Sequence, residues 1–150
     1  KGCYPSRQID TMIALKIDTS QLDKRLATIV KEQPKKVKIA LGETASTGIR
    51  WILRRTIDGQ GLKGAFKPYS ENYALFRELH DKQTAVVDLN FFGDMQKDLV
   101  VTKLTTSKAV ISAISALERK KIAKTDKQRP WFGFKPDEEK RLVRFFGKQL

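Results

Sequence analysis

With 150 residues, of which 40% are hydrophobic and 31% are charged, the chain has the size of one domain and enough apolar side chains for one hydrophobic core. It contains no apolar run of the roughly 18 residues that a membrane-spanning helix needs, and its single cysteine, Cys3, excludes an internal disulfide and a zinc site built from cysteines. The formal charge of +13, from 30 Lys and Arg against 17 Asp and Glu, predicts a polyanionic neighbour, either nucleic acid or an acidic protein surface.

The first part of the chain predicts one strand and two helices. Residues 11–18 alternate in part between apolar and polar side chains, as a strand does. Residues 18–33 show helical spacing, with a cap available at Thr19 or Ser20. Pro34 should end or kink this helix because it has no amide hydrogen, and a second helix then reaches about residue 57. The inward stripe expected for that second helix consists of Val37, Leu41, Thr44, Ala45, Gly48 and Ile52.

Residues 58–68, "DGQGLKGAFKP", contain three glycines and a proline. This composition predicts a long flexible loop with little reason to pack against the rest of the chain. The glycines lack both the spacing and the strand–loop–helix context of a phosphate-binding loop, so we expect no nucleotide site here.

The second part of the chain predicts a small sheet and further helices. Helical spacing returns over residues 69–80, and residues 117–128 form either a basic helix or a charged turn. Three segments have the composition of strands: residues 84–90, 98–106 and 108–116. Pro136, followed by three acidic residues, is typical of the first turn of a closing helix.

These elements predict an α+β fold in a single domain, residues 1–150, with residues 1–10 as an N-terminal extension. N-terminal amphipathic helices would pack on a small, mostly antiparallel sheet. The long glycine-rich loop and the C-terminal helix complete the expected architecture.

Two features resemble enzyme motifs without meeting their requirements. His80 is the lone histidine, and with no second histidine or cysteine cluster it predicts neither a metal site nor a catalytic triad. Residues 136–140, "PDEEK", imitate the carboxylates of a metal-dependent nuclease, but the consecutive Asp137 and Glu138 point about 100° apart on a helix. Acidic side chains at a helix start are sufficiently explained by the helix dipole.

Asp88, Asp94 and Asp98 lie close together in the sequence, as calcium ligands often do. Their spacing is not that of a known calcium-binding loop, so roles in turns and helix caps are the better interpretation. We therefore predict no catalytic residue, no cofactor and no metal ion, and a chain that is not an enzyme.

Two groups of basic residues are candidates for binding DNA or an acidic partner. The first group is Arg50, Arg54 and Arg55, and the second is Arg119, Lys120, Lys121 and Lys124, followed by further basic residues up to 129. A solvated face is the ordinary explanation of one such cluster, but two clusters with a large overall excess favour an anionic partner. Aromatic residues are not interleaved with these cations and no helix-turn-helix or finger pattern occurs, so any DNA contact should be made to phosphates and be sensitive to salt.

Three short segments of the sequence are individually unspecific, but their order and spacing together identify a pattern. They are "FKPYSENYALFRE" (66–78), "VVDLNFFGDMQKDL" (86–99) and "RPWFGFKPDEEKRLVRFF" (129–146). In this order they resemble a family of minor structural proteins of tailed bacteriophages, the neck, tail-completion or head–tail joining proteins, also called virion morphogenesis proteins. The matching positions are Tyr69, Ser70, Tyr73 and Arg77; Val87, Asp88 and Leu89; Gly93, Asp94 and Met95; and Arg129, Pro130, Trp131, Phe132 and Gly133. The likeness covers most of residues 19–148, while Phe92 and Lys135 depart from the pattern, where a threonine and a small capping residue would be expected.

The resemblance implies a structural virion protein at the head–tail junction, assembled in the host cytoplasm. Its partners would be copies of itself in a ring, a hexamer or a dodecamer, together with portal or connector and tail-tube proteins, with no membrane involved. Phage DNA in the channel would be a further partner through phosphate contacts. The resemblance does not separate a tail terminator from a completion or connector layer. The alternative is a basic nucleic-acid-binding protein without sequence specificity.

Contacts between subunits or layers are expected at Tyr69, Tyr73, Arg129, Pro130, Trp131 and Phe132, and loop contacts at Gly59, Gly61, Leu62, Lys63 and Gly64. In an extended segment, neighbouring side chains point to opposite faces. We therefore expect Phe132 in the chain's own core and Trp131 directed outward, as an aromatic anchor for a neighbouring subunit.

Overall fold

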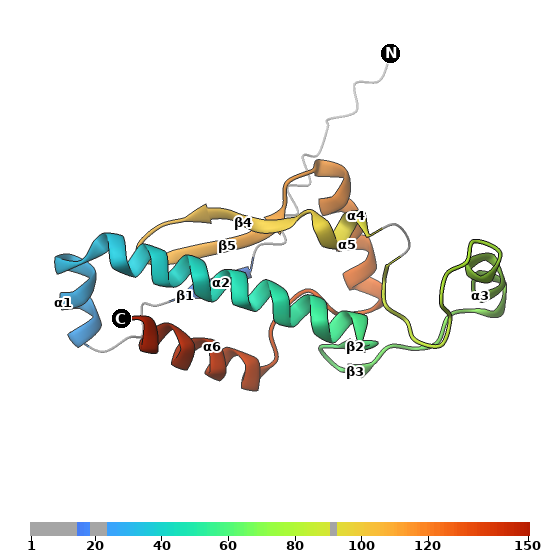
Figure 1. Cartoon of the computed structure of the whole chain (residues 1–150), viewed down its shortest axis with the longest axis horizontal. Coiled ribbons are helices and arrows are strands. Elements are labelled where there is room, and N and C mark those ends of the chain that lie inside the picture. The colour runs from blue at the N-terminus through green and yellow to red at the C-terminus, as the bar shows by residue number, and fades with distance from the viewer. Residues whose placement is uncertain (1–14, 19–23, 91–92) are drawn as a thin grey trace, which may run out of the picture.

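The computed structural model describes residues 15–18, 24–90 and 93–150. The predicted N-terminal extension, residues 1–10, and the cap at Thr19 or Ser20 lie outside the described residues. The fold is α+β, as predicted, and it is built around one long helix, α2 (Pro34–Ile57), with a sheet on one side and the C-terminal helix α6 (Pro136–Gln149) on another (Figure 1).

The main sheet has three antiparallel strands in the order β1 (Leu15–Asp18), β5 (Lys108–Ala113) and β4 (Leu99–Leu104). Ile111 of the central strand faces Leu15 on one side and Val101 on the other, and a register shift follows Val101. The strands predicted within residues 11–18, 98–106 and 108–116 are thus confirmed where the structure describes them.

Pro34 and Pro136 lie in the first turns of helices, as predicted. Helix α1 (Lys24–Glu32) ends two residues before Pro34, which begins α2. All six residues of the predicted inward stripe of α2 are buried. Residues 117–128 take the helical alternative, as α5 (Ala116–Gln128), and the Ser115 side chain accepts from the amides of Leu117 and Glu118 as an N-cap.

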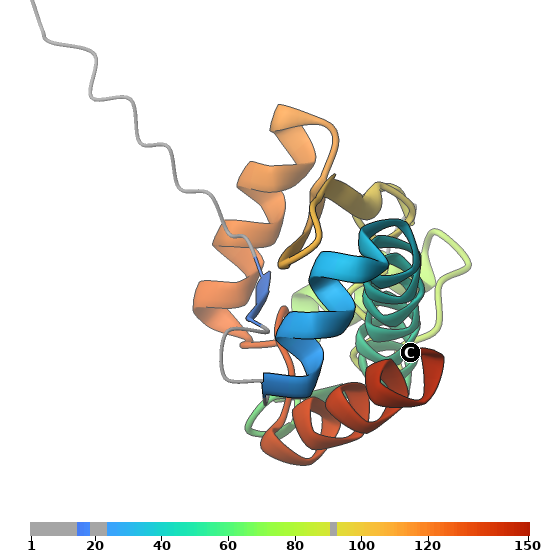
Figure 2. The same ribbon diagram turned by 90° about the vertical axis from the view of Figure 1, so that its left-hand side faces the viewer.

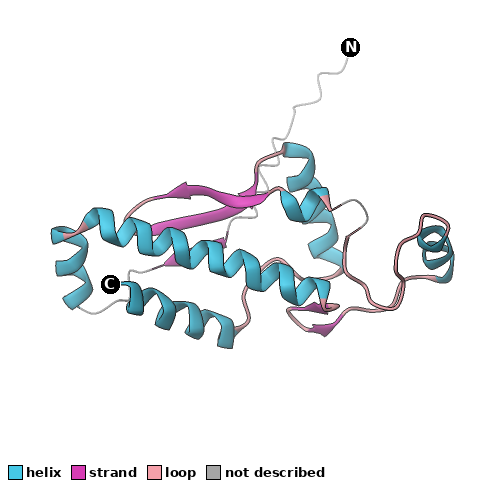
Figure 3. Cartoon of the chain, in the orientation of Figure 1, coloured by secondary structure: helices cyan, strands magenta, loops and turns pink. Residues whose placement is uncertain are grey.

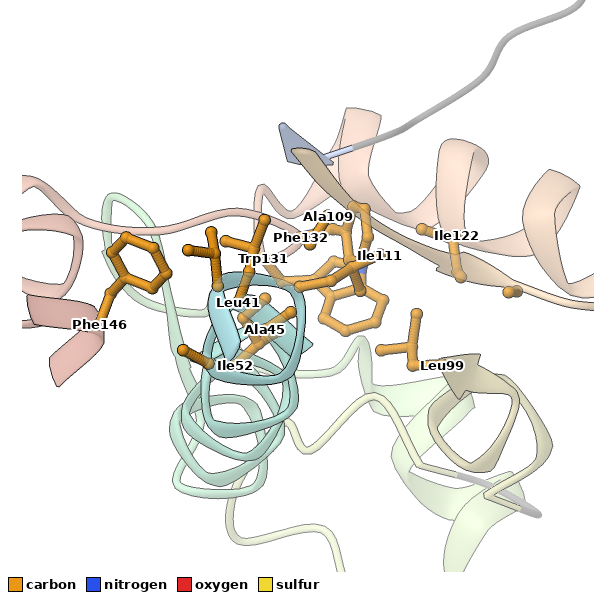
Figure 4. Packing of buried hydrophobic residues seen from close by; sticks show 13 residues of the cluster. Leu41, Ala45, Ile52, Leu99, Ala109, Ile111, Ile122, Trp131, Phe132 and Phe146 are labelled. Atoms are coloured by element: carbon orange, nitrogen blue, oxygen red, sulfur yellow. The ribbon is translucent and has the colours of Figure 1, made fainter. Parts of the chain in front are cut away.

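Apart from residues 69–90, the described chain forms what we call the body. The body has three layers, which are α2, the sheet, and α5 on the opposite side of the sheet from α2 (Figure 2). Because both faces of the sheet are covered, the central strand β5 is mostly buried. The core lies chiefly between α2, the sheet and α6 (Figure 4), and its largest fully buried hydrophobic side chains are Val37, Leu41, Ile52, Ile111, Ile122 and Trp131.

The glycine-rich segment differs from the loop predicted for residues 58–68. It forms a short hairpin of β2 (Gln60–Gly61) and β3 (Gly64–Ala65) that packs on the chain. The amide of Leu62 donates to the Pro130 carbonyl oxygen at 2.8 Å, and a Cβ on Gly61 would collide with that same carbonyl and with the Phe66 ring. Glycine is needed here for close backbone approach, which the composition alone did not distinguish from flexibility.

The strand predicted over residues 84–90 is wrong. The segment is irregular, with Leu89 at a positive φ of 52°, and it is followed by a short helix, α4 (Asp94–Lys97), that the sequence did not predict. Its backbone amides donate to nearby side chains instead of to a neighbouring strand: Val86 to Gln83 Oε1 and Asn90 to Asp88 Oδ1, both at 3.0 Å. A strand-like composition is thus insufficient for a strand where the segment joins neither sheet.

Candidate functional site

Residues 69–90, which we call the arm, leave the body beyond the β2–β3 hairpin. They comprise α3 (Glu71–Glu78) and the irregular segment that returns to α4. Figure 3 shows α3 standing apart from the other helices and strands, and it makes no extensive contact with any other described element. A helix of eight residues is too short to be stable by itself, so something within the arm must hold it.

Arg77 supplies that support from the centre of the arm. Its side chain is 1% exposed and donates hydrogen bonds from Nε to the Gln83 carbonyl oxygen at 2.9 Å and from Nη1 to the Asn90 carbonyl oxygen at 3.1 Å. Its Nη2 lies 3.2 Å from Asp88 Oδ1, which makes a buried ion pair. One guanidinium therefore joins α3 to both ends of the return segment, with the planar multi-donor geometry for which arginine is suited.

Tyr69 closes the same network from the other end of α3. Its hydroxyl donates to Asp88 Oδ1 at 3.1 Å and accepts from the Asp88 amide at 3.3 Å, while the Arg77 guanidinium lies 4.6 Å from the centre of its ring. Burial, together with the negative charge of Asp88, raises the pKa of Tyr69 to about 12. The phenol is therefore neutral at physiological pH and is a structural hydrogen-bond donor.

A row of aromatic rings runs along α3. Ring centres lie 5.1 Å apart for Tyr69 and Tyr73, 6.1 Å for Tyr73 and Phe76, and 4.3 Å for Phe76 and His80. His80 Nδ1 is 2.8 Å from the Phe76 carbonyl oxygen, so the lone histidine is part of the end of this helix. The side chain of His80 is exposed at this position.

The outer surface of the arm is strongly apolar. The exposed fractions are 58% for Leu75, 44% for Phe76, 76% for Leu79 and 44% for Val86. Most exposed hydrophobic residues need no explanation, but four of them on one short projection indicate an interaction surface. The sequence predicted helical spacing over residues 69–80 and did not single out Leu75 and Leu79.

Helix α5 carries its lysines on its exposed side. Asp126 Oδ1 bonds inward, accepting from the amides of Trp131 at 2.8 Å and Phe132 at 2.9 Å, whereas the buried Glu118 pairs with a surface lysine, Lys121, whose Nζ lies 2.7 Å from Glu118 Oε1. The exposed lysines of α5 are Lys120, Lys121, Lys124 and Lys127. Arg119 instead donates to the carbonyl oxygens of Ala113 at 2.9 Å and Ile114 at 2.5 Å, so the second predicted cluster loses this one member to a local structural role.

The prediction that Arg55 contacts DNA or an acidic partner is wrong. Arg55 is 8% exposed and donates to Glu138 Oε2, to the Trp131 carbonyl oxygen at 2.7 Å and to the Gly133 carbonyl oxygen at 2.9 Å. Glu138 also accepts from the Lys135 amide at 2.8 Å, so this carboxylate of "PDEEK" joins the start of α6 to α2. Arg50 and Arg54 are exposed, as predicted for a surface cluster.

The prediction that Trp131 points outward toward a neighbouring subunit is also wrong. Trp131 is fully buried, as is most of Phe132, and the two rings lie 5.7 Å apart in the chain's own core (Figure 4). The alternation argument fails because the segment between α5 and α6 passes through the body and has the chain on both sides. Arg129, from the same predicted set, donates to the carbonyl oxygens of Lys67 at 3.2 Å and Pro68 at 3.3 Å, at the base of the arm.

The remaining predicted contact residues divide by exposure. Gly59 and Gly61 are buried within the hairpin, whereas Lys63 is exposed at its turn; Leu62, Gly64, Tyr69 and Pro130 are partly buried, and Tyr73 is exposed. Asp98 accepts from the Ser115 amide at 2.7 Å and Asp88 pairs with Arg77, in agreement with turn and cap roles for these aspartates. Within the described residues, no group of three or more His, Cys, Asp or Glu side chains could hold a metal ion.

Comparisons with known proteins give no independent assignment: no family model, no curated protein and no solved structure matches this chain. Over the described part of the chain, none of the helices has the length and apolar character needed to cross a membrane.

Proposed function

We propose that this chain is a structural subunit of a tailed-phage virion at the head–tail junction, forming a ring between the capsid portal or connector and the tail. The proposal rests first on the ordered sequence segments that resemble phage neck and tail-completion proteins. It assigns the chain no reaction and no cofactor.

The observation that most supports the proposal is the convergence of separated motif residues. Tyr69 and Arg77 belong to one matching segment and Asp88 to the next, and the three side chains form one buried network that shapes the arm. In an assembly protein the function depends on complementary surfaces between subunits. Motif residues that hold a projecting arm in place are therefore expected in such a protein.

Surface charge supports an anionic partner in the channel. The exposed Arg50 and Arg54 lie on α2 and the exposed lysines lie on α5, where Lys121 and Lys124 line a pocket together with Tyr73 of the arm. A ring of six copies would bring about +78, and such a charge resists closure unless polyanions or acidic surfaces neutralise it. Phage DNA passing through the ring would serve this role through phosphate contacts.

Mass photometry and electron microscopy of the purified protein, alone and with short duplex DNA, test this proposal. Closed rings without DNA are the expected result, with any DNA binding lost as salt rises toward ~0.5 M. A monomer that only binds DNA stoichiometrically would replace the ring with the second candidate, a basic nucleic-acid-binding protein. That candidate is favoured by one observation, the exposure of Lys120, Lys121, Lys124 and Lys127 on α5 while Asp126 of the same helix bonds inward to the Trp131 amide.

A further inference from the structure

The arm and the body differ in charge as well as in shape. Residues 69–90 contain four acidic side chains and two basic ones, a formal charge of −2, which leaves +15 on the rest of the chain. Of the four acids, Asp88 is paired with Arg77 inside the arm, while Glu71, Glu78 and Asp81 are exposed. The arm therefore presents apolar side chains surrounded by carboxylates.

A surface with the opposite composition exists on the same chain. The outer side of α5 carries Lys120, Lys121, Lys124 and Lys127, and at its N-terminal end Ile114 and Leu117 are 65% and 60% exposed. Lysines around two exposed apolar residues are the chemical complement of carboxylates around Leu75 and Leu79. Complementary charges steer two surfaces together and fix their orientation, while apolar contact stabilises them.

We infer that the arm of one copy docks on the outer side of α5 of a second copy. Leu75, Phe76 and Leu79 would contact Ile114 and Leu117, and the three exposed carboxylates would face the lysines of α5. The contact joins two different surfaces, so each copy offers one arm and one α5 face. Repetition of such a heterologous contact closes into a ring if the rotation per copy allows it.

This inference rests on the proposed ring and names its contact. It also assigns the α5 lysines to a protein partner and leaves the arginines of α2 for DNA. Because each contact pairs an acidic with a basic surface, the repulsion between strongly basic bodies is offset where neighbours meet. The electrostatic part of the contact should weaken with salt and the apolar part should persist.

Cysteine cross-linking tests the contact directly. In a Cys3→Ser background, one preparation carries Leu79→Cys on the arm and another carries Leu117→Cys on α5, both at well-exposed positions. The two are mixed and oxidised mildly. The matched control replaces the second partner with Val143→Cys, which is 51% exposed on α6, away from the arm and α5. We expect at least tenfold more disulfide-linked dimer from the Leu79–Leu117 mixture, and equal yields would overturn the inference.

A charge exchange provides the second measurement. Two double variants each reverse the charge on one side of the contact: Glu71→Lys with Glu78→Lys on the arm, and Lys120→Glu with Lys124→Glu on α5. Each should weaken self-association at least tenfold in sedimentation experiments. Mixing the two variants should restore association, because the reversed arm then meets a reversed α5. Failure of the mixture to recover would overturn the contact.

The doubly substituted chain, with Leu79→Cys and Leu117→Cys together, separates this inference from the proposed function. A ladder of linked species ending at one size supports both. A ladder that continues without closing supports the contact and contradicts the ring. Rings seen by electron microscopy without arm–α5 disulfides contradict the contact and leave the ring intact. A disulfide within one chain would show that the arm folds onto its own α5, which also overturns the inference.

Discussion

Among the residues whose burial the structure describes, the body and the arm each contain one buried arginine, and the two make similar bonds for different reasons. Arg55 in the body pairs with Glu138 and bonds to two carbonyl oxygens, and Arg77 in the arm pairs with Asp88 and also bonds to two carbonyl oxygens. Arg55 joins elements that already pack through a hydrophobic core, including Ile52 one turn earlier on α2. Arg77 instead joins α3, which has no extensive contact with another described element, to a return segment that reaches the core only through residues such as Leu89.

This difference explains how the chain projects a stable arm. The body has a hydrophobic core, so it needs Arg55 mainly to fix the position of α6 against α2. The arm leaves Leu75 and Leu79 exposed and depends on polar bonds around Arg77, with support from packed aromatic rings. A projection built in this way can present apolar surface to a partner without collapsing onto the body.

Arg55→Ala should have the largest effect on global stability. Removing one partner of a buried ion pair leaves Glu138 and two carbonyl oxygens without their donor, which costs about 3–5 kcal/mol. Urea denaturation measures this loss. The matched control is Arg54→Ala, whose side chain is 83% exposed beside Asp58 and should change the free energy of unfolding by less than about 1 kcal/mol. Equal losses for the two variants would contradict a structural role for Arg55.

Arg77→Ala should act locally instead. The arm loses its central donor, and we expect the free energy of opening of residues 69–90 to fall by about 3 kcal/mol. Hydrogen exchange should then accelerate about 100-fold in the arm and stay unchanged in α2 and β5. Asn72→Ala, an exposed position on the same helix, is the control. Faster exchange throughout the body would show that arm and body unfold together.

Gly48→Ala tests how closely the body is packed. A Cβ at this position of α2 would lie 2.6 Å from the Phe134 ring, so the substitution should destabilise the fold by about 1–3 kcal/mol despite alanine's better helix propensity. Gly147→Ala on α6 is the matched control, because a Cβ there meets nothing within 4 Å. That variant should gain about 0.5 kcal/mol. A stabilised Gly48→Ala protein would mean that Phe134 moves aside without cost.

Tyr69 gives the arm a dependence on high pH. Because the pKa is about 12 in the folded arm against 10.0 for a free phenol, the neutral phenol favours the folded state. Its stabilisation is fully present below about pH 10 and is lost as pH rises through 12. Absorbance at the phenolate band should show a tyrosine that ionises near pH 12, and Tyr69→Phe should remove this late transition. An unsubstituted protein without this late transition would contradict the network.

The sequence by itself determined the local elements. Helical periodicity placed the inward stripe of α2, Pro34 and Pro136 placed two helix starts, and β-branched runs placed β4 and β5. These signals lie within a few turns of chain, so a single sequence is sufficient to find them. The α+β class follows from their order.

Only the tertiary structure decided which of several similar residues became buried. Arg54 and Arg55 are adjacent and chemically identical, yet only Arg55 meets Glu138, a residue 83 positions away. In the same way, long-range packing buried Trp131 and turned the glycine-rich segment into a hairpin. Residues 84–90 were left without a strand partner for the same reason. Burial depends on what lies across the fold, and no local pattern encodes that.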